Sequence, residues 1–246
     1  MRGICLCGGL GARLGLLTKV TNKHLLQVYD KPMVFYPIKT LVDMGITEIC
    51  LVTGGNYAGK FLELIGNGKR LGLDSVEYQY QEGHGGIADA LKYAERFAGK
   101  EKIAVILGDN IFQDNMRWYK EAFEKRDKGA SIITKVVSRE DAQRFGVVAM
   151  KAGKLYKIIE KPKFPPTRYA VTGLYFYDSQ VWEIIKGLKP SKRGELEITD
   201  VNNTYAKKGQ LTYDVINGHW TDCGAYDTLF KANQLVYDEH RPRNNS

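Results

Sequence analysis

Residues 2–15, RGICLCGGLGARLG, run from an apolar segment directly into a glycine-rich loop. The apolar residues 2–7 predict a buried strand, and the glycines after them predict a loop at its end. Glycine has no Cβ, so backbone N–H groups in such a loop can turn toward an anion. Arg13 adds a permanent positive charge and donors that suit phosphate oxygens. The stretch therefore predicts either a phosphate-binding loop or an ordinary tight turn.

Two common phosphate-binding patterns do not fit this loop. The Walker pattern requires G-x-x-x-x-G-K-[ST], and no glycine here is followed by Gly-Lys at that distance. The dinucleotide pattern G-x-G-x-x-G fits Gly9 and Gly11, but its third position falls on Leu14. An NAD-dependent oxidoreductase, one alternative for this chain, is therefore not favoured.

Two more apolar segments also end in a loop, EICLVTGG at 48–55 and IAVILGDN at 103–110. Strands are also expected at 75–81 and 130–137, and helices at 32–41 (opened by Pro32), 58–65, 88–97 and 115–127. Alternating strands and helices predict a Rossmann-like α/β fold with a mostly parallel sheet flanked by helices. Ligands bind beyond the carboxyl ends of such strands, where the three loops would lie.

The pattern changes after about residue 137. We expect strands at 145–150, 154–161 and 169–178, a helix at 195–208, short strands at 210–216 and 219–222, and a closing helix at 225–240. No repeat, low-complexity tract or flexible linker interrupts the sequence. We therefore predict one mixed α/β domain over residues 1–246, with a nucleotide-binding front half and a more antiparallel back half.

Composition narrows the class of protein. The chain has 246 residues, of which 43% are hydrophobic, and no apolar run approaches the roughly 20 residues of a membrane span. The first residues lack the features of a signal peptide, so a cytoplasmic protein without membrane partners is expected. Neither the four cysteines nor the four histidines have metal-ligand spacing. The net charge of +8 suits a polyanionic partner, but the basic residues are scattered, which disfavours nucleic-acid binding.

Two aspartates are candidate metal ligands. Asp109, in LGDN, follows an apolar strand and is well placed to hold Mg²⁺ beside a nucleotide phosphate. Asp222, in WTDCG, has a similar setting before a glycine turn. Both residues also fit plain turn or helix-capping roles, and their spacing does not show that they meet.

Other side chains are candidates for binding anions, a base and a sugar. Lys23 could add charge to the anion at the glycine loop, and Arg193 could clamp a phosphate. Glu160 could accept hydrogen bonds from sugar hydroxyls while Lys161 neutralises a phosphate. The amide of Gln81 could pair with one edge of a base. Each residue alone is equally compatible with a solvated surface or a loop.

Taken together and in their order along the chain, these motifs resemble those of the sugar nucleotidyltransferases, most closely the short-form glucose-1-phosphate thymidylyltransferases. The segments that carry the resemblance span essentially the whole chain: GGLGARL, KHLLQVYDKPM, LVTGGN, VILGDNIF, FGVV, EKPK, YAVTGLYFYD, RGELEITDVNN and WTDCG. The resemblance implies transfer of a nucleotidyl group from dTTP to glucose 1-phosphate, giving dTDP-glucose and pyrophosphate. It also implies Mg²⁺-assisted, in-line attack of the sugar phosphate on the α-phosphorus, and a homo-oligomer, either a tetramer or a dimer.

The resemblance assigns roles to individual residues. Those implied for the nucleotide are Gly8, Gly9, Gly11, Ala12, Arg13, Lys23, Gln81, Gly86 and Asp109. Those implied for the sugar phosphate are Asn110, Gly146, Glu160, Lys161, Val171, Arg193 and Trp220. Asp109 and Asp222 are the implied Mg²⁺ ligands, and Arg13, Lys161 and Asp109 the implied catalytic residues.

Three positions depart from the family pattern. Ala12 stands where the family usually has Thr or Ser, and Leu16 and Gln27 stand where it usually has proline.

The alternative functions for this chain are the same chemistry with UTP or another hexose 1-phosphate, or a non-catalytic regulatory protein that binds nucleotide sugars. Longer members have C-terminal helices that help form a regulatory site, which is expected to be missing or altered here.

Overall fold

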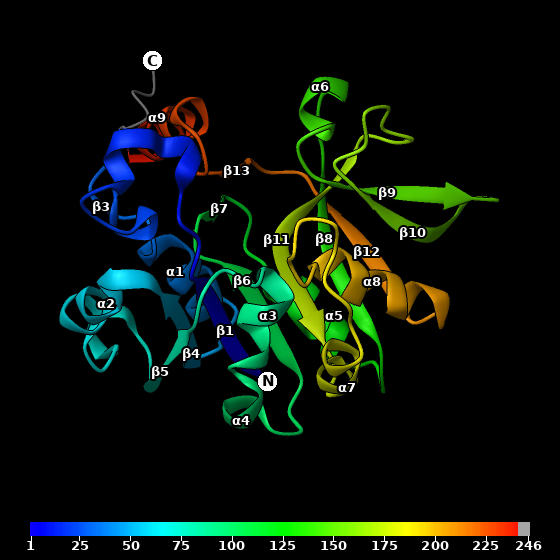
Figure 1. Cartoon of the computed structure of the whole chain (residues 1–246), viewed down its shortest axis with the longest axis horizontal. Coiled ribbons are helices and arrows are strands. Elements are labelled where there is room, and N and C mark those ends of the chain that lie inside the picture. Colours follow the sequence, from blue (N-terminus) through cyan, green and yellow to red (C-terminus); the bar gives the residue numbers. More distant parts are fainter. Residues whose placement is uncertain (241–246) are drawn as a thin grey trace, which may run out of the picture.

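The computed structural model describes residues 1–240 (Figure 1). Its main sheet has nine strands: β1 (Arg2–Cys7), β4 (Glu48–Gly54), β5 (Ser75–Gln81), β6 (Ile103–Leu107), β8 (Ala130–Val136), β9 (Gly146–Lys151), β10 (Lys154–Glu160), β11 (Tyr169–Tyr177) and β12 (Leu211–Ile216). The order is β10-β9-β11-β6-β1-β4-β5, while β8 pairs with β11 and β12 pairs with β8. The predicted mixed α/β sheet is therefore confirmed.

The front half of the sheet is parallel. Strand β1 lies between β4 and β6, and β5 follows β4, all running in one direction. Alternate residues of β1 enter different cores: Ile4 and Leu6 pack in one apolar cluster, Cys5 and Cys7 in another. This period of two places one cluster on each face of the sheet. The continuous apolar run of β1 thus reflects a strand covered on both faces.

The helices are α1 (Phe35–Asp43), α2 (Ala58–Ile65), α3 (Ile87–Lys92), α4 (Glu95–Ala98), α5 (Arg117–Glu124), α6 (Arg139–Ala142), α7 (Gln180–Lys186), α8 (Ile198–Lys207) and α9 (Tyr226–His240). Four 3₁₀ turns accompany them: η1 (Ala12–Thr18), η2 (Lys23–Leu25), η3 (Gly55–Tyr57) and η4 (Lys69–Leu71). Helices α3, α7 and α8 pack together and share one core cluster, whereas α1 and α5 contribute to the other. No helix within residues 1–240 is long and apolar enough to cross a lipid bilayer.

Strand β11 joins the two halves of the sheet. It runs antiparallel to β6, β8 and β9, so the back half is more antiparallel, as predicted. Its pairing with β8 shifts register between Val171 and Tyr175. Beyond this shift, Ala170 pairs with Val147 of β9, which lets the β9–β10 hairpin extend the sheet past the irregularity.

Two small sheets complete the fold. Strand β13 (Trp220–Asp222) pairs with β7 (Asn110–Phe112), which places Asp222 opposite Asn110. The backbone N–H of Cys223 also donates to the carbonyl oxygen of Asp109 at 2.8 Å. A segment late in the chain is thereby fixed beside the end of β6. The other small sheet pairs β2 (Gln27–Val28) with β3 (Lys31–Pro32).

Several predicted boundaries were wrong. The helix expected at 32–41 begins at Phe35 and ends at Asp43, because Pro32 lies in the short strand β3. The helix expected at 88–97 is divided into α3 and α4. Helix α7 and the short strands β2, β3 and β7 had not been predicted. These elements are brief and depend on partners far away in the chain, which local patterns do not report.

Candidate active site

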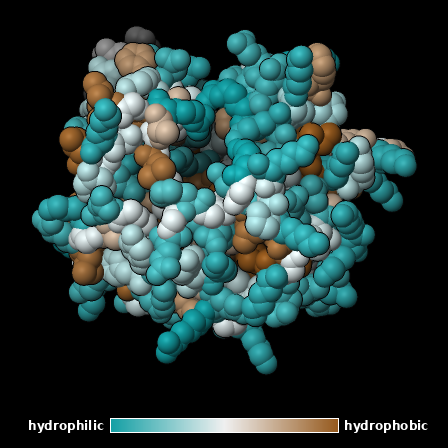
Figure 2. All heavy atoms as spheres, viewed as in Figure 1, coloured by the Kyte–Doolittle hydropathy of each residue, from teal (hydrophilic) through white to brown (hydrophobic). Residues whose placement is uncertain are grey.

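A cavity of about 480 Å³ opens at the carboxyl ends of the parallel strands. Figure 2 shows the surface hollowed between the two upper parts of the molecule. Gly8 follows β1, Gln81 ends β5 and Asp109 follows β6, so three strands of the parallel half deliver their ends to one side of the cavity. Strands β9, β10 and β11 and helix α8 supply the opposite side. Its volume and its polar groups suit a small-molecule ligand.

The cavity gathers most of the residues that the sequence nominates. Its lining includes Gly8, Gly9, Arg13, Lys23, Gln81, Gly86, Asp109, Asn110, Gly146, Glu160, Lys161, Val171, Arg193, Trp220 and Asp222. Gly11 and Ala12 belong to the same loop but do not line it. The backbone at Gly11 is left-handed, with φ of +67°, so this glycine turns the chain into η1.

The glycine loop packs directly against two of the candidate ligand-binding side chains. A Cβ at Gly8 would collide with Oε1 of Gln81. A Cβ at Gly9 would lie 3.1 Å from Cε of Lys23. The absence of side chains at these positions therefore leaves room for the glutamine and the lysine to reach the cavity.

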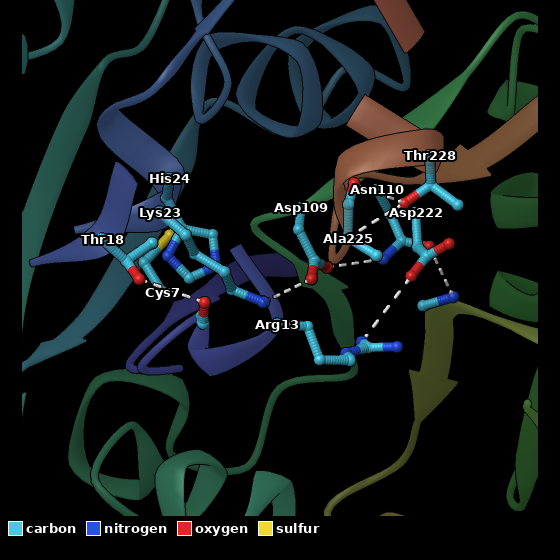
Figure 3. A network of polar contacts seen from close by, with 12 residues as sticks. Cys7, Arg13, Thr18, Lys23, His24, Asp109, Asn110, Asp222, Ala225 and Thr228 are labelled. Carbon is cyan, nitrogen blue, oxygen red and sulfur yellow. Dashed lines mark hydrogen bonds and ion pairs between the residues drawn. The ribbon is translucent and has the colours of Figure 1, made fainter. Parts of the chain in front are cut away.

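Each carboxylate at the centre of the cavity has a cationic partner (Figure 3). Lys23 Nζ lies 2.5 Å from Asp109 Oδ2. Asp222 contacts two guanidinium groups, with Arg144 at 3.3 Å and Arg13 at 3.9 Å. Asn22 positions the lysine segment, because its side chain accepts a hydrogen bond from the backbone N–H of His24 at 2.9 Å.

The two aspartates have opposite pKa shifts. Burial by itself raises the pKa of Asp109, but Lys23, His24 and the hydrogen bond from Asn110 together hold it well below its usual range. Burial raises the pKa of Asp222, and the nearby negative charge of Asp109 raises it further, while Arg144 and Arg13 oppose this. The two carboxylates are neighbours in the fold, because Asp222 lies opposite Asn110 and the N–H of Cys223 donates to the carbonyl oxygen of Asp109.

The carboxylate pair fits a hard divalent cation. Oxygen ligands are those Mg²⁺ prefers, and Mg²⁺ usually takes one or two carboxylates together with substrate phosphates. Within residues 1–240 no group of three or more His, Cys, Asp or Glu residues could hold a metal. A metal bound here would therefore depend on Asp109 and Asp222 and complete its shell with ligand oxygens or water.

The opposite wall carries a second cluster of charges. Glu160 accepts a hydrogen bond from Thr199 Oγ1 at 2.6 Å and contacts Lys161 Nζ at 3.5 Å. Arg193 reaches Glu160 at 4.0 Å but pairs more closely with Glu197, at 2.8 Å. Lys161 has a φ of +42°, a left-handed conformation that is strained for a residue with a side chain. Such strain is concentrated at functional sites.

Asn110 lies in the cavity wall, but its amide is occupied by protein groups. Its Oδ1 accepts hydrogen bonds from the backbone N–H of Gly173 at 3.0 Å and from Trp220 Nε1 at 2.6 Å. Its Nδ2 donates to Asp109 Oδ1 at 2.8 Å. The residue thus connects β7, β11 and β13, and its predicted contact with sugar stays a prediction.

The sequence had not nominated Arg144, Thr199 or Tyr175, all of which line the cavity. Arg144 lies directly before the FGVV segment, whereas Thr199 lies within RGELEITDVNN. A lone arginine or threonine carries no local signal for a binding site. Only the fold brings Arg144 to Asp222.

The family model described as "Nucleotidyl transferase" matches residues 2–239. The chain belongs to this family. Curated relatives of this nucleotidyl transferase include the glucose-1-phosphate thymidylyltransferase of Neisseria meningitidis, 39% identical over 241 residues, covering 96% of this chain and 82% of the relative. The glucose-1-phosphate thymidylyltransferase of Mycolicibacterium smegmatis is 42% identical over 240 residues, with the same coverage.

Solved structures agree with this family assignment. A Bacillus anthracis protein, assigned as a glucose-1-phosphate thymidylyltransferase and solved with a sucrose, superposes with a TM-score of 0.92 at 46% identity. The match covers 99% of this nucleotidyl transferase and 98% of that chain. A UDP-glucose pyrophosphorylase complexed with UDP-glucose shares the fold, with a TM-score of 0.83 at 24% identity.

Proposed function

We propose that the protein is a glucose-1-phosphate thymidylyltransferase, which forms dTDP-glucose and pyrophosphate from dTTP and glucose 1-phosphate. The observation that carries this proposal is the gathering of a glycine loop, a carboxylate pair and a second cationic cluster in one cavity. Relatives at about 40% identity over 96% of the chain carry this name. We further propose that the front half binds the nucleotide and the back half binds the sugar phosphate.

The reaction requires no general base, because the attacking phosphate oxygen is already anionic near neutral pH. Catalysis then rests on alignment and on neutralising charge at the α-phosphorus. Arg13 and Lys23 lie beside the glycine loop and would hold the triphosphate. Lys161 and Arg193 would hold the sugar phosphate on the opposite wall, so attack proceeds in line and pyrophosphate leaves on the far side. When bound to Asp109 and Asp222, Mg²⁺ supplies further positive charge at the phosphates.

Binding requires new partners for the cations. Lys23 is paired with Asp109, and Arg13 and Arg144 with Asp222. With Asp109 and Asp222 as ligands of Mg²⁺, Lys23, Arg13 and Arg144 would be available to phosphate oxygens. The charges of the site therefore stay compensated in both states.

The first test measures pyrophosphate release with Mg²⁺ and glucose 1-phosphate across dTTP, UTP, CTP, ATP and GTP. We expect release with dTTP, and a loss of at least about 100-fold in Asp109→Asn, as for other groups that stabilise transition-state charge. Asp43→Asn is the control: this aspartate lies on the surface and pairs with Lys39, so its activity should match the wild type.

Two other results would redirect the proposal. Release mainly with UTP or CTP would keep the mechanism but overturn the choice of base. No release with any nucleotide, followed by none with other hexose 1-phosphates, would instead support a regulatory protein that binds nucleotide sugars. A homo-oligomer, either a tetramer or a dimer, is also proposed and can be tested by light scattering on the purified protein.

A further inference from the structure

The side-chain amide of Gln81 is held in one orientation at the edge of the cavity. Gln81 is 4% exposed, and its Nε2 donates to Asp89 Oδ2 at 2.8 Å. The same Nε2 donates to the carbonyl oxygen of Gly86 at 3.2 Å. Both protons of the amide nitrogen are therefore directed at acceptors of the protein.

The other end of the amide is open to the cavity. Gln81 Oε1 lies over Gly8, where a Cβ would collide with it, and both residues line the cavity. Within the described residues 1–240, no hydrogen bond is made to this oxygen. Every fully buried polar side-chain atom of those residues has a hydrogen-bond partner, so Oε1 is not one of the fully buried atoms. Oε1 is consequently accessible from the cavity and presents an acceptor to any ligand.

Asp89 decides which end of the amide faces the ligand. Its side chain is mostly buried and lies against Gly85, where a Cβ would be 2.5 Å from Oδ2. Its other oxygen, Oδ1, lies 2.5 Å from Lys92 Nζ, so both oxygens of this side chain face donors. A carboxylate has only acceptor atoms, so it binds the NH₂ of Gln81 and not its oxygen.

We propose that Asp89 is a positioning residue that fixes Gln81 with its oxygen toward the base and so selects bases carrying an N–H at ring position 3. Thymine and uracil carry this donor, whereas cytosine has an acceptor there and would face the glutamine oxygen. This inference rests on the proposed function and specifies the base that the site reads. A site that leaves a buried polar group unpaired rejects the wrong ligand strongly.

The test replaces Asp89 with asparagine. Lys92 can only donate, so it takes the asparagine oxygen and leaves the asparagine NH₂ facing Gln81. Gln81 then turns its own oxygen to the asparagine and its NH₂ toward the base. In Asp89→Asn we expect the ratio of kcat/KM for dTTP to that for dCTP to fall at least about tenfold.

Two comparisons separate orientation from general damage. The ratio for dTTP to UTP should stay at its wild-type value, because both bases carry the N–H. Lys92→Met leaves the carboxylate in place as an acceptor, so its ratio for dTTP to dCTP should also stay unchanged. If Asp89→Asn does not fold, Asp89→Ser provides a hydroxyl that pairs with either amide orientation, and a smaller fall in the same direction is expected, because the Gly86 carbonyl still accepts from the NH₂.

Binding of dTTP and dCTP, measured by calorimetry on folded protein, gives a readout besides turnover. A ratio for dTTP to dCTP that Asp89→Asn leaves unchanged, in binding and in turnover, would overturn the role of Asp89. A wild type that binds dTTP over dCTP but releases no pyrophosphate would overturn the proposed function alone. In that case the shift in the binding ratio of Asp89→Asn would still support the inference.

Discussion

Single residues in the site are explained by their partners and not by their type. The sequence nominated Lys23 for phosphate and Asp109 for metal, but not their contact of 2.5 Å with each other. Likewise, Gln81 was predicted to read the base, whereas no role was predicted for Asp89 or Arg144. The chemistry of one side chain can be predicted from its motif, but its hydrogen-bond partner depends on how distant segments fold together.

His24 makes the stability of the protein depend on pH. It is 2% exposed and its Nδ1 lies 2.7 Å from Asn22 Oδ1, while burial and the adjacent Lys23 lower its pKa to about 3. Below about pH 6.5 His24 becomes protonated in the unfolded chain but stays neutral in the folded chain, so the free energy of unfolding decreases as the pH falls. Between pH 7 and pH 5 this histidine should lower the free energy of unfolding by about 2 kcal/mol.

Urea unfolding at both pH values checks this effect. His24→Gln should lose less stability than the wild type between pH 7 and pH 5, by about the same 2 kcal/mol. His84→Gln, a change at an exposed histidine, is the matched control. Equal losses in wild type and His24→Gln would show that His24 does not set this dependence.

At the scale of elements, all nine strands of the main sheet had been predicted. Continuous apolar runs mark β1, β4 and β6, because these strands are covered on both faces. Helix limits were less predictable, since Pro32 fits the first turn of a helix as well as the strand it occupies. The register shift in β11 spans Gly173, whose backbone N–H donates to Asn110 of β7, a partner that no local pattern reports.

Asn110 stabilises the junction of those three strands. In Asn110→Ala the N–H groups of Gly173 and Trp220 lose their acceptor, at about 1–3 kcal/mol for each buried group. We expect the free energy of unfolding to fall by about 2–4 kcal/mol. Asn115→Ala, a change at an exposed asparagine, is the control and should lower the free energy of unfolding by about 1 kcal/mol or less. Similar losses for both variants, measured by chemical denaturation, would contradict this role.

At the scale of the whole molecule, the cavity lies between the parallel front half of the sheet and the back half, which β11 joins. Its lining combines the loops after β1, β5 and β6 with β9, β10 and α8. A ligand that touches both walls therefore joins the two halves of the sheet. No local pattern could give this arrangement, which follows from the sheet order.

The proposed product, dTDP-glucose, should stabilise the folded protein because it is long enough to contact both walls. At about 100 times its Kd, in the presence of Mg²⁺, we expect about 2.7 kcal/mol of added stability and a higher melting temperature. Glucose alone, which occupies only one wall, is the control. A melting temperature that dTDP-glucose does not change, at any concentration, would argue against this mode of binding.

The pairing of β13 with β7 also has a consequence for the order in which the site matures on the ribosome. The glycine loop and Asp109 both lie in the first half of the chain, after β1 and β6. Asp222 arrives only after β12 has been made, and it must then reach back to Asn110. A nascent chain thus carries the glycine loop and Asp109 well before it acquires Asp222, so the proposed pair of Mg²⁺ ligands is complete only near the end of synthesis.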